Sequence, residues 1–259
     1  MTLLALTGAF AQGNSRTAAA YTIEVGGSTS VTPLMELLAA EYSKAKPNIK
    51  VNINGTGSGD GINNAGVIYQ IGMSSRELTP AEQGKGLKET IIAIDGIAVI
   101  INKNNAVNNL TVEQIRNIYT GAVTNWRQVG GKNAPIAVVS REEGSGTRGA
   151  FEELAGFQGK LLAKANQLTS TGAILANVAQ NPDAIGYISL GSVNDTIKAV
   201  SVGGAAATSA NVVNGSYKIA RPFIVLTGKN VHAESTAFIQ WILGADGQKV
   251  VSKSWIPVK

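Results

Sequence analysis

The hydrophobic and polar positions of this chain follow two alternating periods. Short apolar runs, such as residues 21–25 and the alternating Ile49, Val51 and Ile53, are typical of strands. Glycine, serine or threonine follows each run, and apolar residues at helical spacing come next, as in residues 34–42. Strands that alternate with helices in this way predict an α/β fold with largely parallel sheets.

Further along the chain, the same pattern sets the limits of several elements. Residues 91–103, IIAIDGIAVIINK, are apolar almost throughout, which indicates a strand buried on both faces. Thr111 and Gln114 have the spacing of a capping box and predict a helix start. Residues 201–217 are rich in glycine, alanine and serine, so we expect a loop there, with at most a weak helix.

Composition and charge restrict the class of protein. Hydrophobic residues make up 44% and charged residues 15% of the 259 residues, so the chain has the composition of a folded globular protein. The net charge of +5 suits an anionic partner, but the 22 lysines and arginines form no run of five or six. Nucleic acid is therefore not the expected partner.

Cysteine is absent, and His232 is the single histidine. Thiolate metal sites, thiol catalysis and multi-histidine metal sites are thereby excluded, and a Ser-His-Asp enzyme would have to use His232. The segment GKNVHAESTAF around His232 has neither the spacing of a catalytic acid nor that of a metal ligand, so we expect His232 at the entry of a helix. We expect neither a metal nor a cofactor.

Residues 1–20, MTLLALTGAFAQGNSRTAAA, precede the first predicted strand. Their apolar stretch, from Leu3 to Phe10, is too short to span a bilayer and resembles the end of an export signal. We therefore expect residues 1–20 to be a residual export signal or a disordered leader, and the protein to be exported.

The segment REEGSGTRGAF, residues 141–151, could be a phosphate-binding loop, a nucleophile elbow or a flexible turn. It lacks the lysine of a nucleotide-binding P-loop, and its glycines and serine do not have the register of a nucleophile elbow. An anion site and a flexible turn with a helix cap both stay open, because glycine backbone, hydroxyls and a helix N-terminus serve either purpose. Of Glu142 and Glu143, we expect one to orient Arg141 and the other to face solvent.

Similar loops recur after other predicted strands, in GGSTSV, GTGSGDG and GMSSRE. In parallel α/β sheets such loops gather at the carboxyl ends of the strands, where ligands bind. Helix N-termini carry partial positive charge, so several of them together with Arg141 would suit a dianion. The repetition therefore favours an anion site.

The chain resembles the phosphate-binding subunits of bacterial phosphate ABC importers, the PstS family. The resemblance rests on VGGSTSVTPL, GTGSGDGI, IGMSSREL, NIYTGAVTNWRQVGG, VVSREEGSGTRGAF, NPDAIGYISLG and FIQWILGADGQKVVSKSWIPV, in family order. It implies a two-lobed type II periplasmic-binding-protein fold, with two parallel-rich sheets joined by two crossover strands. Lobe one would comprise residues 21–97 and 221–259, and lobe two residues 98–220.

The resemblance also implies a phosphate site between the lobes. Its residues would be Thr29, Ser30, Ser58, Ser75, Arg141, Ser145, Gly146 and Thr147, with Glu143 bracing the arginine. Ser75 stands where well-known members have an aspartate that accepts the proton of hydrogen phosphate and thereby rejects sulfate. Either Ser75 or the nearby Asp60 would have to take that proton.

The implied function is capture of inorganic phosphate and its delivery to a membrane permease, by an exported, monomeric, non-enzymatic protein. Two alternatives stay open at this stage. One is a binding protein for another tetrahedral oxyanion such as sulfate, and the other is a phosphate-ester hydrolase, which would need Ser or Thr attack without an evident base.

Overall fold

A computed structural model describes residues 20–258. The expectation for the leader, residues 1–20, lies almost entirely outside the described residues. The strands are β1 (Tyr21–Gly27), β2 (Ile49–Gly55), β3 (Ile71–Ser74), β4 (Lys88–Asn102), β5 (Asn109–Leu110), β6 (Ala137–Arg141), β7 (Asn166–Leu168), β8 (Ala184–Ser189), β9 (Ile197–Ala199), β10 (Ser201–Val202) and β11 (Ala220–Thr227). The α-helices are α1 (Thr32–Ala45), α2 (Ser58–Asn64), α3 (Pro80–Gln83), α4 (Val112–Thr120), α5 (Gly146–Ala155), α6 (Thr171–Gln180), α7 (Ser209–Val213), α8 (Ala233–Leu243) and α9 (Ala245–Val251).

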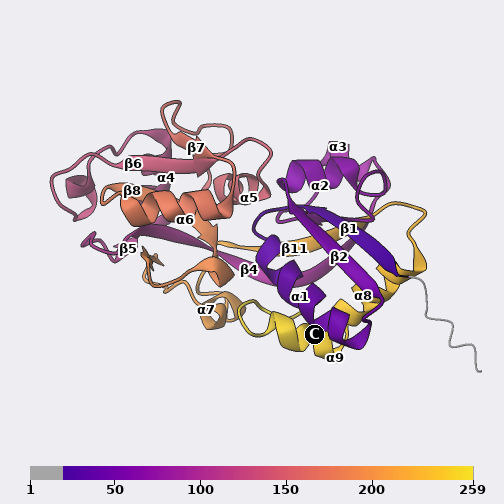
Figure 1. The fold of residues 1–259 in the computed structure, drawn as a ribbon. Helices are drawn as coiled ribbons and strands as arrows, with labels where there is room; N and C mark the ends of the chain where they lie inside the picture. Colours follow the sequence, from indigo (N-terminus) through magenta and orange to yellow (C-terminus); the bar gives the residue numbers. More distant parts are fainter. Residues whose placement is uncertain (1–19, 259) are drawn as a thin grey trace, which may run out of the picture.

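The protein has the expected α/β, two-lobed form (Figure 1). Strands run in the order β2-β1-β3-β11-β4-β8-β6-β7, so one continuous ladder passes from lobe one into lobe two. The pairs β1–β2, β1–β3, β6–β7 and β6–β8 are parallel. The two connecting strands are antiparallel to their neighbours: β11 to β3 and β4, and β4 to β8 and β9. The long strand β4 joins the two halves, because its first part pairs with β11 and its last part with β8.

Each lobe has a hydrophobic core of its own. In lobe one, Val25, Met73 and Phe223 pack with the helices α1, α8 and α9. In lobe two, Tyr119, Phe151 and their neighbours fill the space between the sheet and the helices α4 and α5. Within β4, Ile92 and Ala93 belong to the lobe-one core and Ile97, Val99 and Ile101 to this lobe-two core. Ala98 and Ile100, on the other face of β4, belong to a further cluster with residues of α6. The lobe boundaries at 97/98 and 220/221 stay predictions.

Several helix boundaries follow directly from local sequence. Thr111 and Gln114 form the expected capping box at the start of α4. His232 is the N-cap of α8, in agreement with the helix-entry role, and its ring stacks on Tyr21. Residues 201–217 contain the two-residue strand β10 and the short helix α7, so the segment is not wholly a loop. In residues 20–258, no helix has the length and apolar character that crossing a membrane requires.

Candidate functional site

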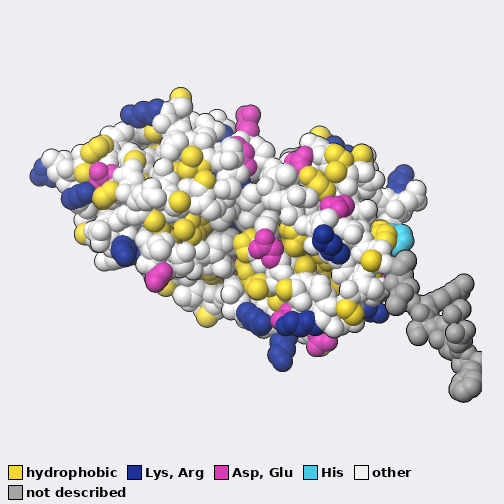
Figure 2. All heavy atoms as spheres, viewed as in Figure 1, with side chains coloured by type: hydrophobic (Ala, Val, Ile, Leu, Met, Phe, Trp, Pro, Cys, Tyr) yellow, Lys and Arg dark blue, Asp and Glu magenta, His cyan; other side chains and the backbone are white. Residues whose placement is uncertain are grey.

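The loops that follow β1, β3 and β6 and the first residues of α2, α5 and α6 meet between the lobes. They contribute a set of buried hydroxyl side chains that we call the hydroxyl cluster: Ser28, Ser30, Ser58, Ser75, Thr147 and Thr171. The first four belong to lobe one and the last two to lobe two. On the face shown in Figure 2, a notch at the upper edge separates the lobes.

One half of the cluster joins the two lobes directly. The Ser30 Oγ lies 2.7 Å from the Thr147 Oγ1 and 3.1 Å from the Thr171 Oγ1. The Thr29 Oγ1 lies 3.3 Å from the Thr171 Oγ1 and accepts a hydrogen bond from the Thr171 backbone N–H. Residues more than a hundred positions apart in the chain thus share one polar site.

The other half of the cluster is built around Ser75, just beyond the end of β3. The Ser28 Oγ donates to the Ser75 Oγ at 2.8 Å, and the Ser58 Oγ lies 3.3 Å from the same atom. The Ser75 backbone N–H also donates to the Ser58 Oγ. These bonds fix the loop after β3 against the start of α2.

Gly146 of lobe two packs directly against the cluster residues Ser58 and Ser75. A Cβ atom on this residue would lie 2.3 Å from the Ser58 Oγ and 2.9 Å from the Ser75 Oγ, distances that real Cβ contacts do not show. The first turn of α5 therefore touches lobe one only because residue 146 has no side chain. The neighbouring Gly59 N–H donates to the Gly144 carbonyl across the same boundary at 3.0 Å.

Arg141 supplies the fixed positive charge beside these hydroxyls. Its side chain is buried, and its Nε and Nη2 donate to the two carboxylate oxygens of Glu142, each at 2.8 Å. Its Nη1 points to the Thr171 Oγ1 at 3.5 Å, which is the longest of its contacts with side chains. One edge of the guanidinium is therefore held by a carboxylate, while the other faces the cluster.

The prediction that Glu143 braces Arg141 is wrong, since Glu142 does so and Glu143 is exposed. β6 ends at Arg141, so the alternation of side chains along a strand no longer applies to residue 142. Its carboxylate can therefore fold back onto its own neighbour. The more general expectation, that one of the two glutamates orients Arg141 and the other meets solvent, is confirmed.

Asp60 does not face the cluster as an acceptor. Its carboxylate accepts hydrogen bonds from Thr56 (2.5 Å), Asn64 (2.7 Å) and Tyr69 (2.9 Å), all within lobe one. These hydrogen bonds lower the pKa of Asp60, and the bond from Thr56 has the largest effect. The structure therefore assigns Asp60 to the internal support of lobe one, and the prediction that it takes a ligand proton is not supported.

The remaining predicted residues divide into cluster members and supports. Thr29, Ser30, Ser58, Ser75, Arg141, Gly146 and Thr147 come together as expected. Ser145 is the N-cap of α5, with its Oγ accepting from the Arg148 N–H. Thr29 and Ser30 lie in the turn before α1, which begins at Thr32 and not at these residues.

Sequence reasoning missed Ser28 and Thr171. Thr171 follows β7 and opens α6, and its context LTSTGA has the same strand, hydroxyl and helix pattern as the recognised loops. That signal could have found it. In the part of the chain that the structure describes, no group of three or more His, Asp or Glu side chains could hold a metal ion.

The fold and this interlobe site define the class of protein. Residues 12–246 match the family model described as a PBP superfamily domain. The PstS phosphate-binding protein of Borreliella burgdorferi is 32% identical over 244 residues, which cover 89% of this chain and 88% of the relative. The chain belongs to this superfamily and, within it, to the PstS family.

Solved structures agree with this assignment. A phosphate ABC transporter substrate-binding protein from Clostridium perfringens, solved with bound phosphate, is 46% identical, with a TM-score of 0.90 over 92% of this chain and 100% of that chain. A phosphate transport receptor from Vibrio cholerae is 36% identical, with a TM-score of 0.75 over 91% of this chain and 99% of that chain.

Proposed function

We propose that the protein binds inorganic phosphate in the hydroxyl cluster and delivers it to a membrane ABC permease. The observation that carries the proposal is that buried hydroxyls from both lobes meet at Thr171, whose Oγ1 lies 3.5 Å from the Arg141 Nη1. The names of the related PstS proteins, and the phosphate bound to the Clostridium protein, support the choice of ligand.

The chemistry of the cluster suits a tetrahedral oxyanion. Hydroxyls that bond one another across the lobes can turn their protons to anionic oxygens, and the N-termini of α5 and α6 add partial positive charge. Hydrogen bonds to a charged group contribute roughly 1.5–3 kcal/mol each. Micromolar affinity requires about 8 kcal/mol, so a few such bonds in excess of the cost of desolvation suffice.

Binding would also favour closure of the lobes. Ser30 comes from lobe one, whereas Thr147 and Thr171 come from lobe two. A ligand that bonds to both sides stabilises the arrangement in which they meet, relative to one in which they are apart. The closed protein would then be the form that the permease recognises.

Ser75 is the residue that we propose as acceptor of the proton of hydrogen phosphate. The Asp60 and Glu142 carboxylates are already bonded to donors of their own. The Ser75 Oγ accepts one bond from Ser28, and when it donates its own proton to the Ser58 Oγ it keeps a second lone pair for the ligand. A neutral acceptor does not repel sulfate, so the preference for phosphate would rest on this one bond.

We further propose that the protein is a monomer outside the cytoplasmic membrane and that it is not an enzyme. In residues 20–258, each cluster hydroxyl bonds to another hydroxyl, to backbone or to Arg141, and none bonds to a carboxylate or imidazole that could act as its base. Release of nitrophenol from 4-nitrophenyl phosphate would contradict the non-enzymatic role.

Calorimetric titration with phosphate and with sulfate tests the function and the selectivity separately. We expect one phosphate per chain, bound at micromolar concentration or tighter, and weaker binding of sulfate. Comparable affinities would contradict the role given to Ser75 but not the oxyanion site. Failure of both anions to bind would contradict the proposed function.

A further inference from the structure

We propose that Arg221, held by Asp95, is a positioning residue for the phosphate site and fixes the Ser75 loop to both strands that link the lobes. We call these two residues the crossover pair. The inference rests on the proposed function, because it concerns one wall of the same site. The side chains of Arg221 and Asp95 bond to none of the cluster hydroxyls, so the hydrogen-bonded route from the pair to the site is the Ser75 backbone carbonyl.

The crossover pair lies inside the antiparallel ladder of β4 and β11. Arg221 and Asp95 are directly opposite each other in the register. The Arg221 Nε and Nη2 donate to the Asp95 Oδ2 at 3.2 and 3.1 Å, and both side chains are almost completely buried. The pair thus joins the two connecting strands at the point where the chain passes between the lobes.

The third nitrogen of the guanidinium reaches the site. The Arg221 Nη1 donates to the Ser75 backbone carbonyl at 3.2 Å. β3 pairs with β11 only as far as Ser74, which lies opposite Ile224, so Ser75 is the first residue beyond the ladder. The bond from Arg221 therefore holds Ser75 to β11 at the point where the backbone pairing of β3 with β11 has ended. It acts on the backbone of the same residue whose hydroxyl belongs to the cluster.

The pair is also attached to lobe two. The Ser189 Oγ, at the end of β8, donates to the Asp95 Oδ1 at 2.7 Å. The Trp255 Nε1, from lobe one, donates to the same Ser189 Oγ at 3.3 Å. A connected set of bonds thus runs from lobe two through Asp95 and Arg221 to Ser75. A change in the angle between the lobes would act on Ser75 through it.

Energetics favour a positioning role over a simple stabilising one. Removing two charges from water costs as much as their attraction returns, and apolar residues of similar size often serve stability equally well. Burial raises the pKa of Asp95 to about 6 although Arg221 opposes the shift, which shows how costly this location is for the charge. What apolar residues would not supply is the directed bond to the Ser75 carbonyl.

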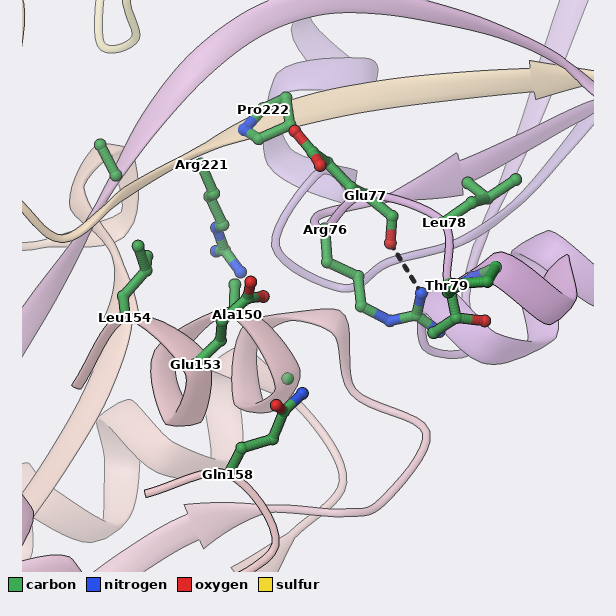
Figure 3. A pocket seen from close by; sticks show the side chains of 13 residues that line it. Arg76, Glu77, Leu78, Thr79, Ala150, Glu153, Leu154, Gln158, Arg221 and Pro222 are labelled. Carbon is green, nitrogen blue, oxygen red and sulfur yellow. Dashed lines mark hydrogen bonds between the residues drawn. The ribbon is translucent and has the colours of Figure 1, made fainter. Parts of the chain in front are cut away.

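The surroundings of Arg221 allow this to be tested by substitution. Arg221 lines a cavity of about 520 Å³ between the lobes, together with Arg76 and with Glu153 and Leu154 of α5. Figure 3 shows the Arg221 side chain extending from β11 toward Glu153, with Arg76 on the opposite side. A methionine at position 221 has room in this cavity. Arg76, which donates to Glu82 and to the Glu77 carbonyl, provides a matched control.

The experiment is a double-mutant cycle read by calorimetric titration with phosphate. Arg221→Met is measured in the wild-type and Ser75→Ala backgrounds, and Arg76→Met in the wild-type background. We expect Arg221→Met to weaken binding at least about tenfold with Ser75 present and by less than about threefold in the Ser75→Ala background, because coupled residues give non-additive effects. Arg76→Met should bind phosphate as the wild type does.

Unchanged affinity in folded Arg221→Met, or an equal loss in both backgrounds, would overturn the proposal. If Arg221→Met does not fold, the paired change Asp95→Leu with Arg221→Met removes both buried charges together and is measured in its place, with the same expected and overturning results. Wild-type protein that binds no phosphate would contradict the proposed function itself, so the two failures can be told apart.

Discussion

Arg141 and Arg221 are both buried arginines paired with a carboxylate, yet their surroundings differ. The side chain of Glu142, the partner of Arg141, is 27% exposed, and the Arg141 Nη1 has only a 3.5 Å contact with Thr171. Asp95, the partner of Arg221, is 0% exposed, and every nitrogen of Arg221 is hydrogen-bonded within the protein.

The difference separates a cation that can bind a ligand from one that holds the structure. The Arg141 Nη1 bonds only to the Thr171 hydroxyl at 3.5 Å, a contact that an anion can replace, and water can reach the carboxylate partner of Arg141. The nitrogens of Arg221 bond to a backbone carbonyl and to a carboxylate that water cannot reach. Burial alone therefore does not identify a ligand-binding arginine, whereas the partners of its nitrogens do.

The largest expected effect is on stability and concerns the two carboxylates. Asp95→Ala leaves the Arg221 charge buried without a partner, which should lower the free energy of unfolding by about 3–5 kcal/mol. Glu142→Ala should cost less, because water can replace a partly exposed carboxylate and the Leu168 carbonyl still accepts from the Arg141 Nε. Urea unfolding of both variants measures the difference. Equal losses would contradict the distinction between the pairs.

The second-largest expected effect is the loss of phosphate affinity in Arg141→Met. Loss of a buried charged donor costs roughly 2–5 kcal/mol, so we expect phosphate affinity to fall at least about a hundredfold. Arg127→Met is the matched control, since Arg127 is an exposed arginine of lobe two. Calorimetric titration of both variants is the measurement. If Arg141→Met bound phosphate with wild-type affinity, Arg141 would not be the positively charged residue that binds the ligand.

Gly146→Ala should disturb the contact between the lobes and reduce phosphate affinity less than Arg141→Met does. The added methyl group would overlap Ser58 and Ser75, and overpacking of this kind costs typically about 1–3 kcal/mol. We therefore expect about a tenfold or greater loss of phosphate affinity. At Gly144 a Cβ meets nothing within 4 Å, so Gly144→Ala should bind normally. If the two variants titrate alike, the close contact of α5 with lobe one does not matter for binding.

The smallest effect concerns the pH dependence of stability. The pKa of Asp95 is raised from 3.8 to about 6, so the folded protein binds this proton more readily than the unfolded chain. Ionisation of Asp95 should therefore reduce stability as the pH rises through about 6, by about 1 kcal/mol between pH 5 and pH 7. Urea unfolding at both pH values, with Asp95→Asn as reference, isolates this contribution. A wild type that gains stability relative to Asp95→Asn from pH 5 to pH 7 would reverse the predicted sign.

Local sequence patterns predicted much of the fold and most of the cluster. The capping box at Thr111 and the hydroxyl-rich loops at Ser30, Ser58 and Thr147 depend on residues close together in the chain. The choice between Glu142 and Glu143 could not be made, because it depends on where β6 ends. The sequence left open whether Asp60 or Ser75 takes the proton, because the bonds that occupy the Asp60 carboxylate, from Thr56, Asn64 and Tyr69, depend on how this loop and helix fold.

The crossover pair lay beyond sequence reasoning for a different reason. Asp95 and Arg221 are separated by 126 positions, and their contact depends on the register of β4 against β11. Asp95 interrupts a run that is predicted to be buried, but no residue near it in the chain identifies Arg221 as its partner. Only the register shows that the two charges face each other inside the sheet.

A crystal structure of the protein grown with phosphate tests the central claim most directly. We expect a tetrahedral anion within hydrogen-bond distance of the Arg141 guanidinium and of hydroxyls from both lobes, among them Ser30 and Thr147. An anion bound elsewhere, or one that touches a single lobe, would contradict the proposal that the hydroxyl cluster is the phosphate site.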